Sequence, residues 1–154
     1  MSENRTVKIL KLEHFDNNLA LPSYETAQAA GADIRASLEN RDQLVIPSGQ
    51  RVLIPTGLSF EIPAGFEVQV RPRSGLSLKT NLLVVNSPGT IDADYRGEIK
   101  IIMGNFGDRD EVINHGDRVA QIVLAPVTQA GFEVVEELGS TERGAGGFGS
   151  TGRN

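Results

Sequence analysis

The spacing of glycine and proline is the feature that most limits what this chain can fold into. There are 17 glycines and seven prolines among 154 residues, and after Pro22 the longest stretch that lacks both is Ala32–Ile46. Because proline breaks helix interiors and glycine weakens them, the chain has no room for long helices. Short β-branched or alternating runs fill the intervals, which indicates an all-β sandwich or barrel. The strands are expected at Thr6–Leu10, Gln43–Ile46, Gly57–Ile62, Phe66–Val70, Glu98–Ile102 and Val119–Leu124.

One segment departs from this pattern. The run Ser74–Thr80 follows Arg71-Pro72-Arg73 and suits one or two helical turns with Ser74 as the N-cap. The free backbone N–H groups at the start of such a turn offer a place for an anion. The sequence therefore predicts an all-β domain with one short helix.

Composition excludes several classes of protein. The chain has no cysteine, which excludes disulfides, thiolate metal sites and a cysteine nucleophile. Its net charge of −5 is unlike that of a general nucleic-acid binder. No apolar stretch suits a membrane helix or a secretory signal, so a cytoplasmic protein without a membrane partner is expected. An anionic substrate would need basic side chains concentrated locally.

The last sixteen residues, Gly139–Asn154, contain six glycines and only two apolar side chains. A flexible tail explains that composition. The alternative is a segment that wraps a phosphorylated ring compound, because a cation, clustered backbone amides, two hydroxyls and one aromatic ring occur together in it. We therefore divide the chain into a β domain, residues 1–138, and a C-terminal arm, residues 139–154.

A polar segment, residues 86–97, lies between the strand-like runs Leu82–Val85 and Glu98–Ile102 and resembles the loop of a hairpin. If it is extended, Asp92 and Asp94 point the same way, while Asp92 and Tyr95 face opposite sides. One interpretation is a polar turn that carries acids. The other makes one carboxylate a general base for water and the tyrosine a flat surface for a sugar or ring.

Two further polar segments have simple structural explanations. Asp33 suits an ordinary turn before a strand, and Asp117 suits a hairpin turn with a local ion pair to Arg118. The two histidines, His14 and His115, lack the spacing of a zinc site.

Taken together and in order, five blocks of the sequence resemble the five motifs of the trimeric deoxyuridine triphosphate nucleotidohydrolases (dUTPases). The most specific strings are Pro72–Leu76 and Gly89–Gly97. The departures are small: Ser77 stands where alanine is usual, and Asn114-His115 stand where a basic residue is often found. The blocks are Ala30–Ala36, Arg71–Lys79, Asn86–Lys100, Gly116–Leu124 and Arg143–Gly152.

The resemblance implies a jelly-roll β fold and a homotrimer whose active sites are shared between chains. It implies Mg²⁺-dependent hydrolysis of dUTP to dUMP and pyrophosphate, with water attacking the α-phosphorus. That reaction would supply dUMP for thymidylate synthesis and keep uracil out of DNA. No nucleic-acid partner is expected.

The same resemblance implies roles for residues of the central motifs. Asp92 would be the general base, and Gln121 would support the phosphate and water network. Asp33 would lie near the waters of the metal, for which no direct protein ligand is expected. The phosphate chain would be held by Arg73, Ser74 and Gly75.

The base and the sugar would be bound by the hairpin and covered by the arm. Tyr95 would lie under the deoxyribose, and Phe148 would cover the uracil face. The uracil pocket would be formed by Asn86, Thr90, Ile91 and Lys100. The arm would close over the nucleotide with Arg143, Phe148, Gly149, Ser150 and Thr151.

Two alternatives compete with this interpretation. A dCTP deaminase shares the fold, but it should lack the loop around Asp92 and the glycine-rich arm, both of which are present. A non-enzymatic trimer that binds dUTP and reports it to a protein partner is the second alternative. The intact Asp92 favours turnover over pure binding.

Overall fold

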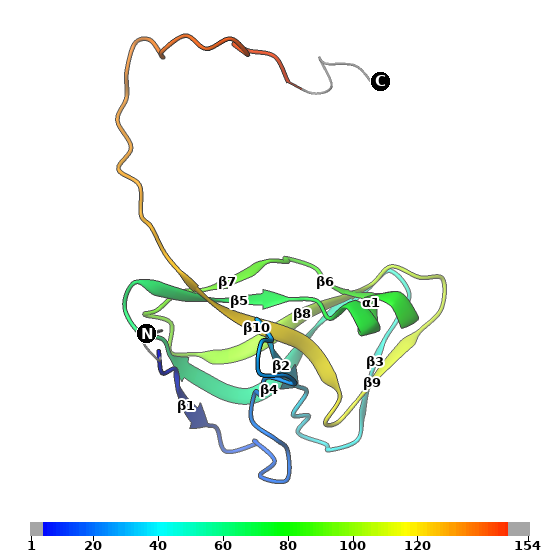
Figure 1. The fold of residues 1–154 in the computed structure, drawn as a ribbon. Coiled ribbons are helices and arrows are strands. Elements are labelled where there is room, and N and C mark those ends of the chain that lie inside the picture. The colour runs from blue at the N-terminus through cyan, green and yellow to red at the C-terminus, as the bar shows by residue number, and fades with distance from the viewer. Residues whose placement is uncertain (1–4, 148–154) are drawn as a thin grey trace.

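The computed structural model describes residues 5–147 and has two main β layers with one short helix (Figure 1). One sheet has the order β1-β4-β8-β6, the other β2-β10-β5-β7, and β3 pairs with β9; every ladder is antiparallel. The predicted all-β jelly-roll fold is confirmed. The elements are β1 Lys8–Lys11, β2 Ala32–Arg35, β3 Gln43–Ile46, β4 Arg51–Glu61, β5 Phe66–Arg71, α1 Ser74–Lys79, β6 Leu82–Val84, β7 Gly89–Ile91, β8 Glu98–Asn105, β9 Glu111–Asn114 and β10 Arg118–Pro126.

The core lies between the two four-stranded sheets. Alternate residues of β8 are buried, among them Ile99, Ile101 and Met103, as expected for a strand with one face against a core. Val68 and Val70 of β5 are buried against it from the other sheet. This packing fixes the positions of β5, β7 and β8, the strands that carry the candidate site.

The strand β4 is longer than the sequence predicts. Instead of starting at Gly57, it runs for 11 residues through Pro55, so the predicted boundary is wrong. The reason is a break in the ladder with β8, where Pro55 pairs with Lys100 and Ser59 pairs with Glu98. A proline has no N–H to donate, and an irregularity in the ladder accommodates it without ending the strand.

The predicted helical turn is confirmed at Ser74–Lys79, but its cap is not. Arg73 is the N-cap residue, with no side-chain capping bond, so the assignment of Ser74 as N-cap is wrong. At the other end, the Thr80 hydroxyl donates to the Leu76 carbonyl at 2.8 Å. Within residues 5–147, no helix has the length and apolar character needed to cross a membrane.

The segment that was predicted to be a hairpin loop crosses between the two sheets. Strands β6 and β8 do pair, as in a hairpin. The intervening β7, however, pairs with β5 in the other sheet. The chain therefore leaves one layer after β6, adds a short strand to the other layer, and returns to begin β8.

The last strand ends at Pro126, and the described residues after it run away from the β body (Figure 1). Several large apolar side chains on this stretch are almost fully exposed, including Phe132, Val134 and Leu138. Large apolar side chains exposed together mark a segment that packs against another surface.

Candidate active site

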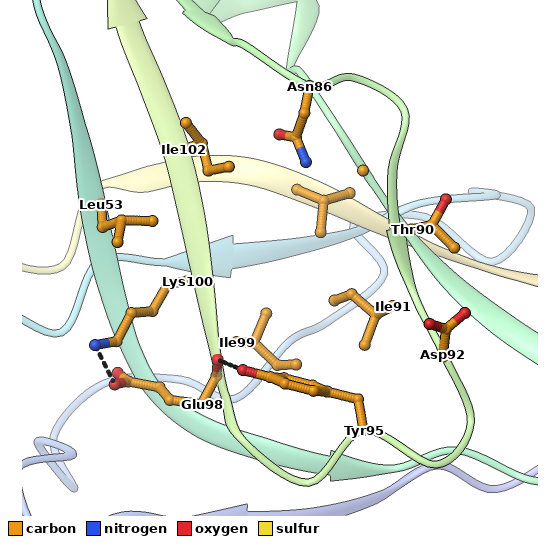
Figure 2. Close-up of a pocket in the computed structure, with 12 residues that line it drawn as sticks. Leu53, Asn86, Thr90, Ile91, Asp92, Tyr95, Glu98, Ile99, Lys100 and Ile102 are labelled. Atoms are coloured by element: carbon orange, nitrogen blue, oxygen red, sulfur yellow. Dashed lines mark hydrogen bonds and ion pairs between the residues drawn. The ribbon is translucent and has the colours of Figure 1, made fainter.

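A cavity of about 460 Å³ opens between β7 and β8 (Figure 2). Among the described strands no ladder joins these two, because β7 pairs with β5 and the first residues of β8 pair with β4. The cavity is therefore bordered by two strand edges whose main-chain groups are available to a ligand. Its lining includes the predicted Asn86, Thr90, Ile91, Asp92, Tyr95 and Lys100, and also Leu53, Val70, Gly89, Glu98, Ile99 and Ile102.

The hydrogen bonds at this edge of β8 show which residues present their main chain to the cavity. The carbonyl of Ile102 accepts the N–H of Val85 at 2.9 Å, and the carbonyl of Glu98 accepts the Tyr95 hydroxyl at 3.1 Å. Because alternate residues of a strand direct their N–H and C=O to the same edge, Lys100 also presents its main chain there. Its ammonium lies 3.4 Å from a Glu98 carboxylate oxygen instead. Lys100 thus lines the cavity through its backbone.

The floor and the ends of the cavity differ in character. Ile91, Ile99 and Val70 supply an apolar floor. Asn86 and Tyr95 stand at opposite ends (Figure 2). An apolar floor beside two hydrogen-bonding edges suits a flat heterocycle, because the faces of the ring are apolar and its rim is polar.

Asp92 and Tyr95 line the same cavity, although extended geometry would have placed them on opposite sides. The chain is not extended here, because β7 ends at Ile91 and the Tyr95 N–H donates to the Asp92 carbonyl at 3.1 Å. The prediction of opposite sides is therefore wrong. The turn leaves the Asp92 carboxylate exposed, where it can contact water and a ligand.

A second cluster of predicted residues surrounds Arg73. Its Nε donates to Asp33 Oδ1 at 2.9 Å, and its Nη1 donates to the Arg118 carbonyl at 3.2 Å. The Arg118 guanidinium lies 3.0 Å from the other Asp33 oxygen. Both oxygens of Asp33 are thus bound to guanidinium groups, and the Arg73 side chain is held in one orientation beside the start of α1.

Arg118 is a site residue that the sequence did not reveal. The predicted local pair with Asp117 is wrong: Asp117 instead accepts the N–H of Asn114 at 2.8 Å. Arg118 reaches Asp33 and Glu25, which are remote in sequence. No local signal could have indicated that pairing.

Gln121, on β10, contacts the main chain next to Arg73. This strand lies between β2 and β5, and Gln121 is in register with Asp33 on one side and Arg71 on the other. Its Nε2 donates to the Pro72 carbonyl at 2.8 Å. A side chain at Gly31 would overlap the side-chain amide oxygen of Gln121 and would force that side chain to move.

The two clusters lie at opposite ends of β5 within one chain. Ile91 pairs with Val68, so Asp92 falls beside Glu67, while Arg73 follows the other end of the strand. From Glu67 to Arg73 the chain spans about 20 Å at the usual strand rise. None of the described residues around Arg73 lines the cavity.

The arm residues stand apart from both clusters. Arg143 lies on the segment that runs away from the β body, where its Nε donates to the Gly146 carbonyl at 2.8 Å. The other predicted arm residues lie outside the described part of the chain; they are Phe148, Gly149, Ser150 and Thr151.

Glu98 is a second residue that the sequence did not single out. Burial acts to raise the pKa of its carboxyl, but hydrogen bonds from the Gly57 N–H and His14 and the charges of His14 and Lys100 outweigh that effect. The net result is a lowered pKa, so the group is a carboxylate at neutral pH.

Within residues 5–147, no three histidine or acidic side chains gather closely enough to hold a metal ion. Each histidine contacts a single carboxylate, His14 that of Glu98 at 2.9 Å and His115 that of Asp16 at 3.1 Å.

Comparisons with known proteins agree on one family. The dUTPase family model matches residues 17–152. The deoxyuridine 5'-triphosphate nucleotidohydrolase of Bdellovibrio bacteriovorus is 59% identical over 147 residues, which covers 96% of each chain.

A variant dUTPase of Staphylococcus bacteriophage 80alpha, solved with dUpNHpp, is 26% identical with a TM-score of 0.82, and the match covers 96% of this chain and 99% of that one. A variant dUTPase of phage phi11 of S. aureus, whose structure describes the coordination of a structural Mg(II) ion, is 25% identical with a TM-score of 0.74; the match covers 88% of this chain and 99% of that one. This chain belongs to the dUTPase family.

Proposed function

We propose that this chain hydrolyses dUTP to dUMP and pyrophosphate, the reaction of a dUTP diphosphatase. The observation that carries the proposal is the cavity between the edges of β7 and β8, where main-chain groups, Tyr95 and Asp92 meet. Its floor suits a base, the tyrosine ring suits a sugar, and the carboxylate suits a water beside the α-phosphorus. The reaction supplies dUMP for thymidylate synthesis and keeps uracil out of DNA.

Uracil is read mainly by main-chain groups. The Lys100 backbone and the free edge of β7 supply donors and acceptors in fixed positions. Cytosine reverses the pattern at two ring positions and leaves buried groups unpaired, at about 1–3 kcal/mol for each group. We expect a methyl group on the ring to be excluded sterically. The side chains that complete the pocket are those of Asn86, Thr90 and Ile91.

Asp92 is the general base. Its carboxylate takes a proton from a water, the water oxygen bonds to the α-phosphorus, and the pyrophosphate group leaves with the electrons of the broken bond. Tyr95 lies under the deoxyribose, where its ring leaves no room for a 2′-hydroxyl. The exposed position of Asp92 at the rim of the cavity supports this assignment.

Arg73 and the backbone amides of Ser74 and Gly75 bind the phosphate chain. The contacts of Arg73 with Asp33 and with the Arg118 carbonyl leave one nitrogen of its guanidinium for a phosphate oxygen. Gln121 holds the Pro72 carbonyl, and so fixes the approach to α1. Orientation of this kind is the main requirement of phosphoryl transfer.

The donor set fits a Mg²⁺ ion that is carried by the triphosphate and its waters. Asp33, the acidic residue beside Arg73, already has both oxygens on guanidinium groups, so it can contact waters of the ion more readily than the ion itself. Mg²⁺ retains several waters and prefers phosphate oxygens. When bound, it neutralises charge on the triphosphate.

The site is shared between the chains of a homotrimer. Asp92 and Arg73 of one chain lie about 20 Å apart along β5, which is more than an arginine side chain spans. This separation supports the contribution of two chains to one triphosphate. The exposed apolar side chains after Pro126 supply a segment that packs on a neighbouring chain.

The arm, residues 139–154, closes over the bound nucleotide from a third chain. Arg143 contacts the phosphates and Phe148 covers the uracil, with the adjacent glycine and hydroxyl residues between them. The extended course of the described arm residues is consistent with this reach. Because the substrate belongs to the pool of DNA precursors, we place the protein in the cytoplasm.

Turnover of dUTP, compared with that of the four standard dNTPs and of UTP, tests the proposal. Purified protein with Mg²⁺ should release pyrophosphate from dUTP far faster than from the other nucleotides. Ammonia released from dCTP would identify a deaminase. Tight binding of dUTP without pyrophosphate release would identify a nucleotide sensor, and either result would overturn the proposal.

A further inference from the structure

Tyr95 is held in place by two features of the chain that follows it. Its hydroxyl donates to the Glu98 carbonyl at 3.1 Å, and a side chain at Gly97 would overlap that hydroxyl. The ring therefore lies across Gly97 with its end on the first residue of β8 (Figure 2). Because 47% of the Tyr95 surface is exposed, packing alone does not fix the ring.

The Glu98 carbonyl is in turn fixed by the side chain of the same residue. One carboxylate oxygen accepts the Gly57 N–H at 2.9 Å and lies 2.9 Å from His14 Nε2. The other lies 3.4 Å from the Lys100 ammonium. The Glu98 side chain is only 12% exposed, so these contacts are sheltered from water and hold it firmly.

These contacts occur where the ladder between β4 and β8 is interrupted. Between the pairs Pro55–Lys100 and Ser59–Glu98, β4 has two more residues than β8, so Gly57 lies in the irregular part of the ladder, although Glu98 itself is in register with Ser59. The Glu98 carboxylate accepts a hydrogen bond from the Gly57 N–H, which has no backbone partner in β8 at the irregularity. The side chain thus replaces a missing backbone bond beside the carbonyl that holds Tyr95.

We propose that Glu98 is a positioning residue that sets the preference for deoxyribose over ribose by fixing Tyr95. The inference rests on the proposed place of Tyr95 under the sugar. Without the carboxylate, Glu98 keeps its pairing with Ser59 but loses the contacts with Gly57 and His14, so its carbonyl can shift and the Tyr95 hydroxyl loses a well-placed acceptor. The ring then tilts and admits a 2′-hydroxyl. Asp92 and Arg73 do not contact Glu98, so the hydrolysis of dUTP is affected less.

The test is the ratio of kcat/KM for dUTP to kcat/KM for UTP. Loss of one well-placed hydrogen bond should lower this ratio by about threefold to tenfold in Glu98→Ala, mainly through faster turnover of UTP. Glu98→Gln should keep most of the preference, because its amide oxygen can still accept the Gly57 N–H. Glu61→Ala is the matched control: it removes an exposed carboxylate, paired with Lys8 at 2.6 Å on the same sheet, and should leave the ratio unchanged.

A double-mutant cycle with Tyr95→Phe separates positioning from a general structural role. If Glu98 acts through the tyrosine hydroxyl, adding Glu98→Ala to Tyr95→Phe changes the ratio no further. A wild-type ratio in Glu98→Ala, or losses that multiply in the double variant, would overturn the inference. A lowered melting temperature with an unchanged ratio has the same consequence. If Glu98→Ala does not fold, His14→Ala, which removes one contact at the same oxygen, takes its place under the same criteria.

Tyr95→Ala distinguishes failure of this inference from failure of the proposed sugar site. If Tyr95→Ala leaves the ratio unchanged, the ring does not read the sugar, and both the proposed role of Tyr95 and the inference fall. If Tyr95→Ala lowers the ratio while Glu98→Ala and His14→Ala do not, only the role of Glu98 falls.

Discussion

At the scale of single residues, the proposed role of Asp92 as the general base is tested by its replacement with asparagine, which keeps the shape while removing the proton acceptor. We expect turnover of dUTP by Asp92→Asn to fall at least ~10²-fold, which is typical for loss of a general base. Affinity for dUpNHpp should be largely kept, because the cavity floor and both strand edges are intact. Steady-state kinetics and calorimetric titration measure the two quantities. Near-normal turnover would remove Asp92 from the mechanism.

Also at this scale, Glu98 links stability to pH. Its pKa in the folded state is lowered from the ordinary value of 4.5. The stabilisation that the ionised Glu98 carboxylate contributes to the fold is therefore fully present above pH 4.5, and it is lost as the pH falls through the folded pKa. We expect Glu98→Gln to lower the melting temperature at neutral pH, and the difference from wild type to shrink as the pH falls below that ordinary value and through the folded pKa. A melting-temperature difference that stays constant as the pH falls would contradict the linkage, and Glu133→Gln, which replaces an exposed carboxylate beyond the last strand, is the control.

At the scale of elements, the proposal assigns separate tasks to the β body and the arm. The described residues after Gly139 make local contacts, such as that of Arg143 with the Gly146 carbonyl, and bury no large apolar side chain. We expect truncation after Leu138 to leave the melting temperature almost unchanged while turnover of dUTP collapses. A chain that lacks only Arg153 and Asn154 is the control. A truncated protein that keeps its activity, or that unfolds, would refute the assignment of the arm.

At the scale of the whole molecule, the proposed sharing of sites between chains predicts complementation between two inactive variants. A working site needs its Asp92 hairpin from a truncated chain and its arm from a full-length Asp92→Asn chain. With random assembly of an equal mixture, roughly a quarter of the sites should regain activity. Mass measurement confirms mixed trimers, and each variant refolded alone is the control. Activity no higher than that of either variant alone would refute the shared site.

Much of this protein is determined by local sequence. Glycine and proline act on the residues beside them, so their spacing excluded long helices and indicated short strands such as Gln43–Ile46, which the structure confirms as β3. The helical turn after Arg73 was indicated by local residues in the same way. The sequence motifs around Arg73 and Asp92 indicated the dUTPase family, and the comparisons confirm that assignment.

The tertiary structure decided what depends on register between distant segments. The partners Arg118 and Asp33 are 85 positions apart, and His14 and Glu98 are 84 apart. The crossing of β7 to the other sheet brought Asp92 and Tyr95 to one cavity. A ladder also fixes which edge of a strand is free, which is why Lys100 contributes its backbone instead of its charge. The spacing of residues specifies helices and strands because conformational propensity depends on neighbouring residues. The contacts between distant residues are decided only when the two sheets pack together.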